Sequence, residues 1–266
     1  MAGNLAFHCF RRVKERPRRS LGSSALASAL VPPHDDLQPA FERLGQAGWP
    51  EVDPGVTLAV PVGAFEQHGP HLPLDTDTRV AEALAQRLPG VVVAPSIAYG
   101  ASGEHEGFPG TISIGSNALR SVLVEYGRSA CRWANRVVFV NGHGGNVATL
   151  IGAVELLRYE GRDVAWIPCA VPGADAHAGR TETSLLLWLS PEMVDISRAE
   201  VGNTDDIADL LPRLREGGVR AVAPNGVLGD PRRSSATEGR DIMAEMTERS
   251  AAALDRWMPS QRGMLT

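Results

Sequence analysis

The chain concentrates its histidines in short segments that are also rich in glycine and acidic residues. Five of its seven histidines lie in four such segments, at 66–71, 103–106, 141–146 and 175–179. Imidazole and carboxylate groups together are the ligands that suit zinc, iron or manganese. Glycines beside them let the backbone turn tightly and a substrate approach closely. The pattern predicts a metal-dependent hydrolase.

Five side chains from these segments and their flanks form a candidate metal-binding set. The set consists of Glu66, His68, Asp77, His143 and Glu182. Glu66 and His68 are two residues apart, so in an extended backbone their side chains share one face. Carboxylates can bridge two divalent ions, and imidazoles fix the geometry. Two ions about 3.5–4 Å apart would hold a hydroxide between them and polarise a carbonyl oxygen, which is chemistry that cleaves an amide.

Each candidate also has an interpretation without chemistry. A glutamate before a turn usually caps a helix. A single histidine in the core or on the surface more often has its hydrogen bonds made by protein or water than binds a metal. Asp77 could cap the helix that follows it. Glu182 could be an ordinary carboxylate in the first turn of a helix. The common location of the candidates near strand ends favours the metal site.

The elements that would position these residues alternate between strand and helix. Apolar runs predict strands over 57–62, 91–97, 136–140 and 163–170. Helical spacing predicts helices over 78–88, 117–134, 148–160, 181–189 and 239–258. We expect Asn117 to cap its helix and Pro95 to bend or end its strand. Residues 221–229 are expected to form a loop within a packing and assembly region, in which 226–230 could contact substrate.

The alternation of strands and helices predicts an α/β fold, with three α-β-α layers around a mostly parallel sheet. Active sites of such sheets lie beyond the carboxyl ends of the strands. The strands predicted over 57–62 and 136–140 lead directly into the two segments richest in histidine. Residues 46–266 are expected to form one domain. The arginine-rich segment 1–45 is expected to be a disordered extension, with a targeting segment or an anion-binding arm as alternatives.

Composition excludes several classes of function. The net charge of −5 over 266 residues gives no electrostatic argument for a nucleic-acid partner. No apolar run approaches the ~20 residues that would cross a membrane. The three cysteines are far apart and form no CxxC pair, which predicts a reducing cytoplasm. The absence of GxSxG, GxGxxG and GxxxxGK[ST] motifs disfavours a covalent serine mechanism and nucleotide binding.

Four segments resemble the signature blocks of the creatininase family of metal-dependent amidohydrolases. They are 63–77 (GAFEQHGPHLPLDTD), 103–111 (GEHEGFPGT), 141–146 (NGHGGN) and 177–184 (HAGRTETS), in the family's order. The resemblance implies a creatininase-like fold and two divalent metal ions bound by the five candidate ligands, with Asp77 bridging them. Zinc and iron are the metals expected, with manganese as an alternative.

The resemblance also implies roles for neighbouring residues. His177 would shuttle a proton to the leaving amine, and Glu182 would be both ligand and part of the catalytic machinery. His71 and His105 would orient ligands or line the pocket. Creatininase itself carries a glutamate two residues after the equivalent of His143, where this chain has glycine at 145. Glu182 is the expected replacement for that ligand.

Further segments, at 98–115, 123–130, 257–259 and 263–266, are similar to the family's subgroup of mycofactocin-biosynthesis peptidases. That similarity implies cleavage near the C-terminus of a modified precursor peptide, with release of a cross-linked Val-Tyr-derived dipeptide. The family resemblance implies a homo-oligomer, a hexamer or similar. A creatininase-like amidohydrolase or deformylase acting on a small cyclic amide or formamide is the alternative. A non-catalytic metal-binding scaffold is the alternative from another class.

Overall fold

A four-stranded parallel sheet forms the centre of the fold. The computed structural model describes residues 43–266, so most of the extension expected over 1–45 lies outside the described residues. The strands are β1 (Thr57–Val62), β2 (Val91–Val93), β3 (Arg136–Asn141) and β4 (Val164–Pro168). Their order is β2-β1-β3-β4, and every neighbouring pair is parallel. The strands are almost wholly apolar because helices cover both faces of the sheet.

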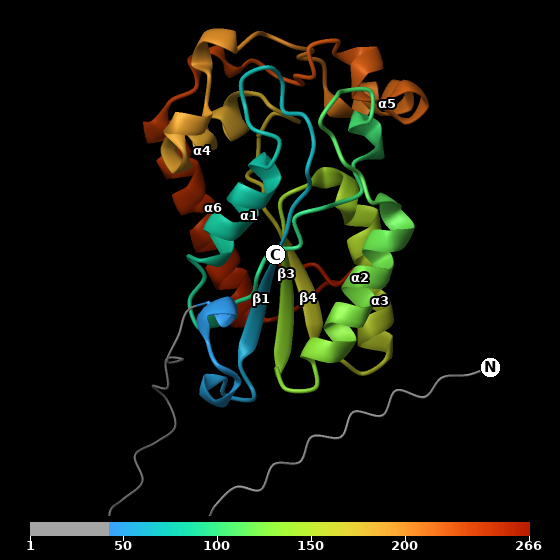
Figure 1. Cartoon of the computed structure of the whole chain (residues 1–266), viewed down its shortest axis with the longest axis vertical. Coiled ribbons are helices and arrows are strands. Elements are labelled where there is room, and N and C mark those ends of the chain that lie inside the picture. The colour runs from blue at the N-terminus through green and yellow to red at the C-terminus, as the bar shows by residue number, and fades with distance from the viewer. Residues whose placement is uncertain (1–42) are drawn as a thin grey trace, which may run out of the picture. The chain divides into compact units, whose positions relative to one another are not determined.

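Helices form the two outer layers (Figure 1). One face is covered by α1 (Thr76–Ala85), α4 (Arg180–Leu189) and α6 (Ala236–Arg256). The other is covered by α2 (Gly115–Ala130) and α3 (Val147–Tyr159). The predicted three-layer arrangement is therefore confirmed. A further helix, α5 (Ile207–Val222), lies away from both layers, beyond one end of the sheet.

In the part of the chain that the structure describes, seven short 3-10 helices lie before β1 or in the connections between these elements. They are η1 (Leu44–Gln46), η2 (Trp49–Glu51), η3 (Gly103–His105), η4 (Gly144–Asn146), η5 (Pro191–Met193), η6 (Ile196–Arg198) and η7 (Pro231–Arg233). Within residues 43–266, no helix is both long and apolar enough to cross a membrane.

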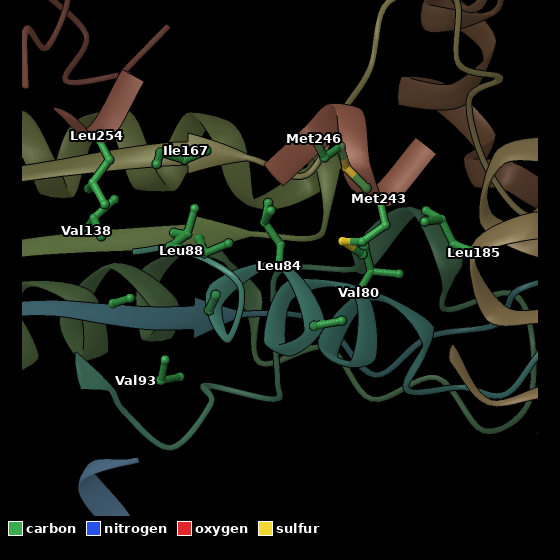
Figure 2. Packing of buried hydrophobic residues seen from close by; sticks show 14 of the residues in the cluster. Val80, Leu84, Leu88, Val93, Val138, Ile167, Leu185, Met243, Met246 and Leu254 are labelled. Atoms are coloured by element: carbon green, nitrogen blue, oxygen red, sulfur yellow. The ribbon is translucent and has the colours of Figure 1, made fainter. Parts of the chain in front are cut away.

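Each face of the sheet has its own apolar core. Successive residues of β3 point to opposite faces, so Val138 joins one core and Phe139 the other. The first core contains Val138 together with Leu84 of α1 and Met243 and Leu254 of α6, which Figure 2 labels. Burial of these side chains fixes the helices on the sheet and so fixes the segments that begin or end at its edge.

The structure corrects two details of the predicted elements. Asn117 is not a helix cap, because α2 begins two residues earlier, at Gly115, and its N-cap residue is Ile114. The second correction is α5, which the sequence pattern did not reveal. It contains Pro212 and a kink at Gly218, where φ is 69°, and these residues disguise the helical spacing. By contrast, β2 ends at Val93, before Pro95, as expected.

The carboxyl end of β3 packs closely against the start of α1. Gly142 follows β3, and a side-chain carbon at this position would lie 2.3 Å from the backbone oxygen of Asp77. Only glycine allows the two segments to approach so closely. The contact holds Asp77, in the first turn of α1, beside the histidine that follows β3.

Candidate metal centre

The five predicted ligands meet beyond the carboxyl ends of β1 and β3. Glu66 and His68 lie in the segment after β1, and His143 follows β3. Asp77 and Glu182 lie in the first turns of α1 and α4. Four of the side chains are almost completely buried, while that of Glu182 is 23% exposed. The structure thus brings together residues that are far apart in the sequence.

Glu66, Asp77 and His143 form the first group of potential ligands. Oε1 of Glu66 lies 3.2 Å from Nδ1 of His143, and Oδ2 of Asp77 lies 3.4 Å from the same nitrogen. Both carboxylate oxygens of Glu66 and Oδ2 of Asp77 are buried without a hydrogen-bond partner. Such oxygens are costly unless something compensates their charge. A divalent cation among these three side chains would satisfy them, so the residues fit a metal ion.

His68, Asp77 and Glu182 form a second group beside the first. Nε2 of His68 lies 3.1 Å from Oδ1 of Asp77 and 3.8 Å from Oε2 of Glu182. His177 also offers a ring nitrogen within 4.8 Å of the donor atoms of His68 and Glu182. Asp77 therefore directs one oxygen to each group, as a carboxylate that bridges two ions would.

The structure decides differently on the two purely structural interpretations, a helix cap at Asp77 and a first-turn carboxylate at Glu182. The N-cap residue of α1 is Asp75, and Oδ1 of Asp77 faces His68, so Asp77 is not the cap. Glu182 accepts a hydrogen bond from the backbone N–H of Ala178, as a first-turn carboxylate often does. It also faces His68 at 3.8 Å, so the first-turn interpretation is confirmed and the ligand role stays a prediction.

Gln67 contacts two of the histidines around the centre, His105 and His177, and no sequence pattern pointed to it. Its Oε1 accepts a hydrogen bond from the N–H of Gly69 (2.9 Å), which identifies Nε2 as the donor nitrogen. That nitrogen donates to the carbonyl oxygen of Gly226 (3.0 Å) and to Nδ1 of His105 (2.9 Å). His105 therefore carries its proton on Nε2, which faces Oε1 of Glu66 at 3.2 Å. In this tautomer the N–H of His105 faces the carboxylate of Glu66. Glu66, His105 and His177 also offer donor atoms within 4.8 Å of one another, so the outer role expected for His105 stays a prediction.

The same segment fixes the tautomer of His177. Its Nε2 lies 2.8 Å from the backbone carbonyl oxygen of Gln67, which can only accept, and 3.0 Å from the amide nitrogen of Gln67. The two hydrogens of that amide are directed to Gly226 and His105, so we assign the proton to Nε2 of His177. The lone pair is then on Nδ1, which lies 3.8 Å from Oε1 of Glu66. The ring lies against that of His68 at a tilt of 40°, with a centroid separation of 4.3 Å. His177 therefore presents an unprotonated ring nitrogen to the centre.

His71 lies behind the ligands. Its Nε2 forms a 2.8 Å hydrogen bond with Oγ1 of Thr183, which follows Glu182 in α4. Burial, followed by the charge of His68, lowers the pKa of His71 to about 4. His71 thus joins the segment after β1 to α4, which agrees with its expected role of orienting ligands.

Charges at the first group are strongly coupled. Burial would raise the pKa of Glu66, but His143, His105 and His68 bring it well below its usual range. Burial would lower the pKa of His143, but Glu66 and Glu104 raise it well above the usual value. Without a metal ion, His143 is therefore protonated between two carboxylates at neutral pH.

The second group behaves in a similar way. Burial would lower the pKa of His68, but Asp77 and Glu182 raise it to about 10. Burial raises the pKa of Glu182 to about 7 despite the opposing charge of His68. Burial, then the charges of His68 and His105, lowers the pKa of His177 well below its usual value. Among these groups, His177 is the imidazole held neutral.

A cavity of about 950 Å³ opens onto the centre. Asp77, His143, His177 and Glu182 contribute to one part of its lining. Residues of α5 form a mixed wall, in which Ile207, Leu211 and Leu214 are apolar and Arg215, Glu216 and Arg220 are charged. The region after residue 190 was expected to serve packing and assembly, with 226–230 as a possible substrate contact, so the part that α5 takes in the cavity was not expected. This region adds a wall to the site, and Leu228 pairs through its backbone with His177.

The family profile described as creatinine amidohydrolase matches residues 46–254. The chain belongs to the creatininase family. The resemblance of the four sequence blocks is thereby confirmed. Members of the creatininase family are amidohydrolases and peptidases, so the chain is a hydrolase that acts on C–N bonds.

Relatives in the creatininase family are similar over most of the chain. The mycofactocin precursor peptide peptidase of Mycolicibacterium smegmatis is 59% identical over 218 residues, covering 79% of this chain and 88% of the relative. The protein of the same name from Mycobacterium tuberculosis is 54% identical over 244 residues, covering 86% of this chain and 96% of the relative.

Solved structures of creatininase share the fold. One, described as creatininase with Mn, superposes with a TM-score of 0.68 at 27% identity, covering 82% of this chain and 99% of that chain. A mutant creatininase of the Zn–Zn type gives a TM-score of 0.66 at 27% identity, covering 82% of this chain and 98% of that chain. These similarities agree with the parallel sheet and its two helical layers.

Proposed function

We propose that the protein is a metal-dependent peptidase that cleaves the modified C-terminus of the mycofactocin precursor peptide. The product is a cross-linked Val-Tyr-derived dipeptide. Identities of 59% and 54% to two peptidases of that name support the choice of substrate. The observation that carries the proposed chemistry is the pair of buried carboxylates, Glu66 and Asp77, whose unpartnered oxygens lie among histidines.

The proposed centre holds two divalent metal ions. Glu66, Asp77 and His143 would bind one ion, and His68, Asp77 and Glu182 would bind the other. Zinc and iron are the proposed metals, with manganese as the alternative; creatininase structures described with Mn and as the Zn–Zn type support a divalent centre. Ions bound there would lower the pKa of a water molecule and polarise the carbonyl carbon of the scissile bond.

The residues of the chain supply positioning and proton transfer. His177 accepts a proton from the attacking water at Nδ1 and returns it to the nitrogen of the leaving amine. The backbone carbonyl of Gln67 holds the other ring nitrogen, so the ring keeps its orientation during both transfers. Nε2 of His105 lies 3.2 Å from Oε1 of Glu66, and this contact would keep that carboxylate directed to the centre.

The cavity supports a peptide over a small cyclic amide. Its volume of about 950 Å³ is at the upper end of the range of about 300–1,000 Å³ usual for small-molecule pockets. The apolar residues of α5 in this lining offer contact area that a peptide with apolar side chains would bury. A compact polar amide would leave those apolar residues without a partner.

The test uses the full chain, stripped of metal and then supplied with zinc, iron(II) or manganese. Each form is incubated with the modified precursor peptide, with the unmodified peptide and with creatinine, and the products are measured by mass spectrometry. We expect release of the dipeptide from the modified peptide only, and only after metal is restored. Metal-loaded protein that leaves the modified peptide intact would contradict the peptidase assignment. Turnover of creatinine alone would favour the small-amide alternative.

Three further expectations remain part of this proposal. Residues 46–266 form one domain, and the chain assembles into a homo-oligomer, a hexamer or similar. Light scattering on the purified protein tests the assembly. The compartment is a reducing cytoplasm, which the free thiols of Cys131 and Cys169 support.

A further inference from the structure

The turn after β3 leaves a space beside His143 that a carboxylate from another element fills. Residue 145 is a glycine in η4. A side-chain carbon at Gly145 would lie 2.3 Å from Nε2 of His143 and 2.4 Å from Oε1 of Glu104. Both distances are too short for a real contact, so the missing side chain is what allows Glu104 and His143 to approach each other.

The backbone around Glu104 is held from two sides. The residue lies in η3, and the next residue, His105, is buried and bonded to Gln67. On the other side, Gly218 of α5 packs so closely that a side-chain carbon there would lie 2.6 Å from the carbonyl oxygen of Glu104. The carboxylate therefore extends from a fixed backbone into the lining of the cavity, where its side chain is 33% exposed.

The two nitrogens of His143 face different partners. Nδ1 points to the carboxylates of Glu66 and Asp77, at 3.2 and 3.4 Å. Nε2 lies 3.3 Å from the carbonyl oxygen of Ala101 and 3.5 Å from Oε1 of Glu104. An ion of the first group would therefore bind Nδ1, and Nε2 would carry the proton. Both neighbours of Nε2 are acceptors for that proton.

We propose that Glu104 is a positioning residue for the metal centre. Its carboxylate and the carbonyl of Ala101 share the Nε2 proton of His143, and this holds Nδ1 toward the ion. A carboxylate on the far nitrogen of a ligating histidine fixes the ring and its tautomer and makes the ligating nitrogen more basic. The inference rests on the proposed metal function and adds a residue that touches neither the ions nor the reacting atoms.

The experiment measures the affinity of the full chain for Zn²⁺ by competition with a chromophoric chelator. We expect Glu104→Ala to weaken the binding of one ion by about 10–100-fold, the usual effect of losing such an outer partner. Glu104→Gln should weaken it less, because the amide oxygen still accepts a proton from Nε2. The control is Glu106→Gln, an exposed residue two positions away, which should bind as the unaltered chain does.

A spectroscopic readout separates positioning from general damage to the fold. With Co²⁺ in place of zinc, we expect Glu104→Ala to shift the visible absorption bands, while the metal-free variant melts at the same temperature as the unaltered metal-free chain. An unchanged Zn²⁺ affinity in Glu104→Ala would overturn the inference. So would the complete loss of one ion at saturating Zn²⁺, because Glu104 would then be a direct ligand. Failure of the unaltered chain to bind Zn²⁺ would instead refute the proposed function.

Discussion

At the scale of single residues, Asp77 connects the two halves of the centre. Its Oδ1 lies 3.1 Å from Nε2 of His68, and its Oδ2 lies 3.4 Å from Nδ1 of His143. A side chain in this position determines whether two ions can be held together. The neighbouring Asp75 has a different role, because it pairs with Arg79 on the partly exposed surface of α1.

Replacement of Asp77 should therefore remove both metal binding and activity. We expect Asp77→Asn to lose most of its bound metal and to reduce kcat/KM by more than about 100-fold, since even outer partners of a metal centre are worth about 10–100-fold. Metal content is measured by inductively coupled plasma mass spectrometry. Asp75→Asn is the matched control and should keep its metal, because exposed ion pairs contribute little. Equal metal content in the two variants would contradict the bridging role.

Metal binding should release protons from the centre. His68 has its pKa raised to about 10 and His143 has its pKa raised well above the usual value, so both are protonated in the metal-free protein at pH 7.5. Metal ions bind only the deprotonated rings, so we expect the release of about one proton per ion and an affinity that rises about tenfold per pH unit for each ion. The rise should level off above about pH 10, where His68 is already neutral.

Calorimetry in two buffers with different ionisation enthalpies counts these protons. The measurement at pH 7.5 should give about two protons for two ions. Below pH 7 the number should increase, because Glu182, whose pKa is raised to about 7, then also carries a proton. Binding without proton release at pH 7.5 would contradict the assignment of His68 and His143 as ligands.

At the scale of elements, the contact between α4 and α6 determines where Glu182 lies. Gly239 in α6 faces the backbone of α4, and a side-chain carbon there would lie 1.8 Å from the carbonyl oxygen of Ser184. Ser184 also donates to Glu238, which pairs with Arg180 at the start of α4. The helix that carries Glu182 is thus fixed by close packing at its first turn.

Gly239→Ala should push the two helices apart. Overpacking of this kind typically costs about 1–3 kcal/mol, and the displaced α4 should bind the second ion more weakly. Thermal unfolding and metal content are the measurements. Gly152→Ala in α3 is the control, because its nearest neighbour, Nε of Arg120, lies 3.9 Å from the added carbon. That variant should be neutral or more stable by up to about 1 kcal/mol. Similar melting temperatures for the two variants would show that the α4–α6 contact tolerates extra volume.

The helix α5 shows where prediction from sequence fails at this scale. The strands of the sheet were predictable because a buried parallel strand is a short continuous apolar run, as in β1 and β3. Pro212 and Gly218 interrupt the pattern of α5, and its apolar residues face the cavity or a small separate cluster instead of the main core. Its contribution to the site depends on long-range packing, which local spacing does not reveal.

At the scale of the whole molecule, the parallel sheet explains why distant residues could be predicted to meet. Parallel strands end at the same edge, so the segments after β1 and β3 were expected to be neighbours. The sequence could not indicate the hydrogen-bond partners in that edge. Alternation of side chains would turn Gln67 away from Glu66 and His68, yet the irregular backbone after β1 directs its amide to His105. The sequence did not indicate the proposed role of Glu104, because its approach to His143 depends on the side chain that is missing at Gly145.

Anomalous X-ray diffraction from crystals of the zinc-loaded chain tests most directly whether two divalent ions bind at the edge of the sheet. We predict two zinc peaks, one among Glu66, Asp77 and His143 and the other among His68, Asp77 and Glu182. The absence of any peak within coordination distance of Asp77 would contradict the account.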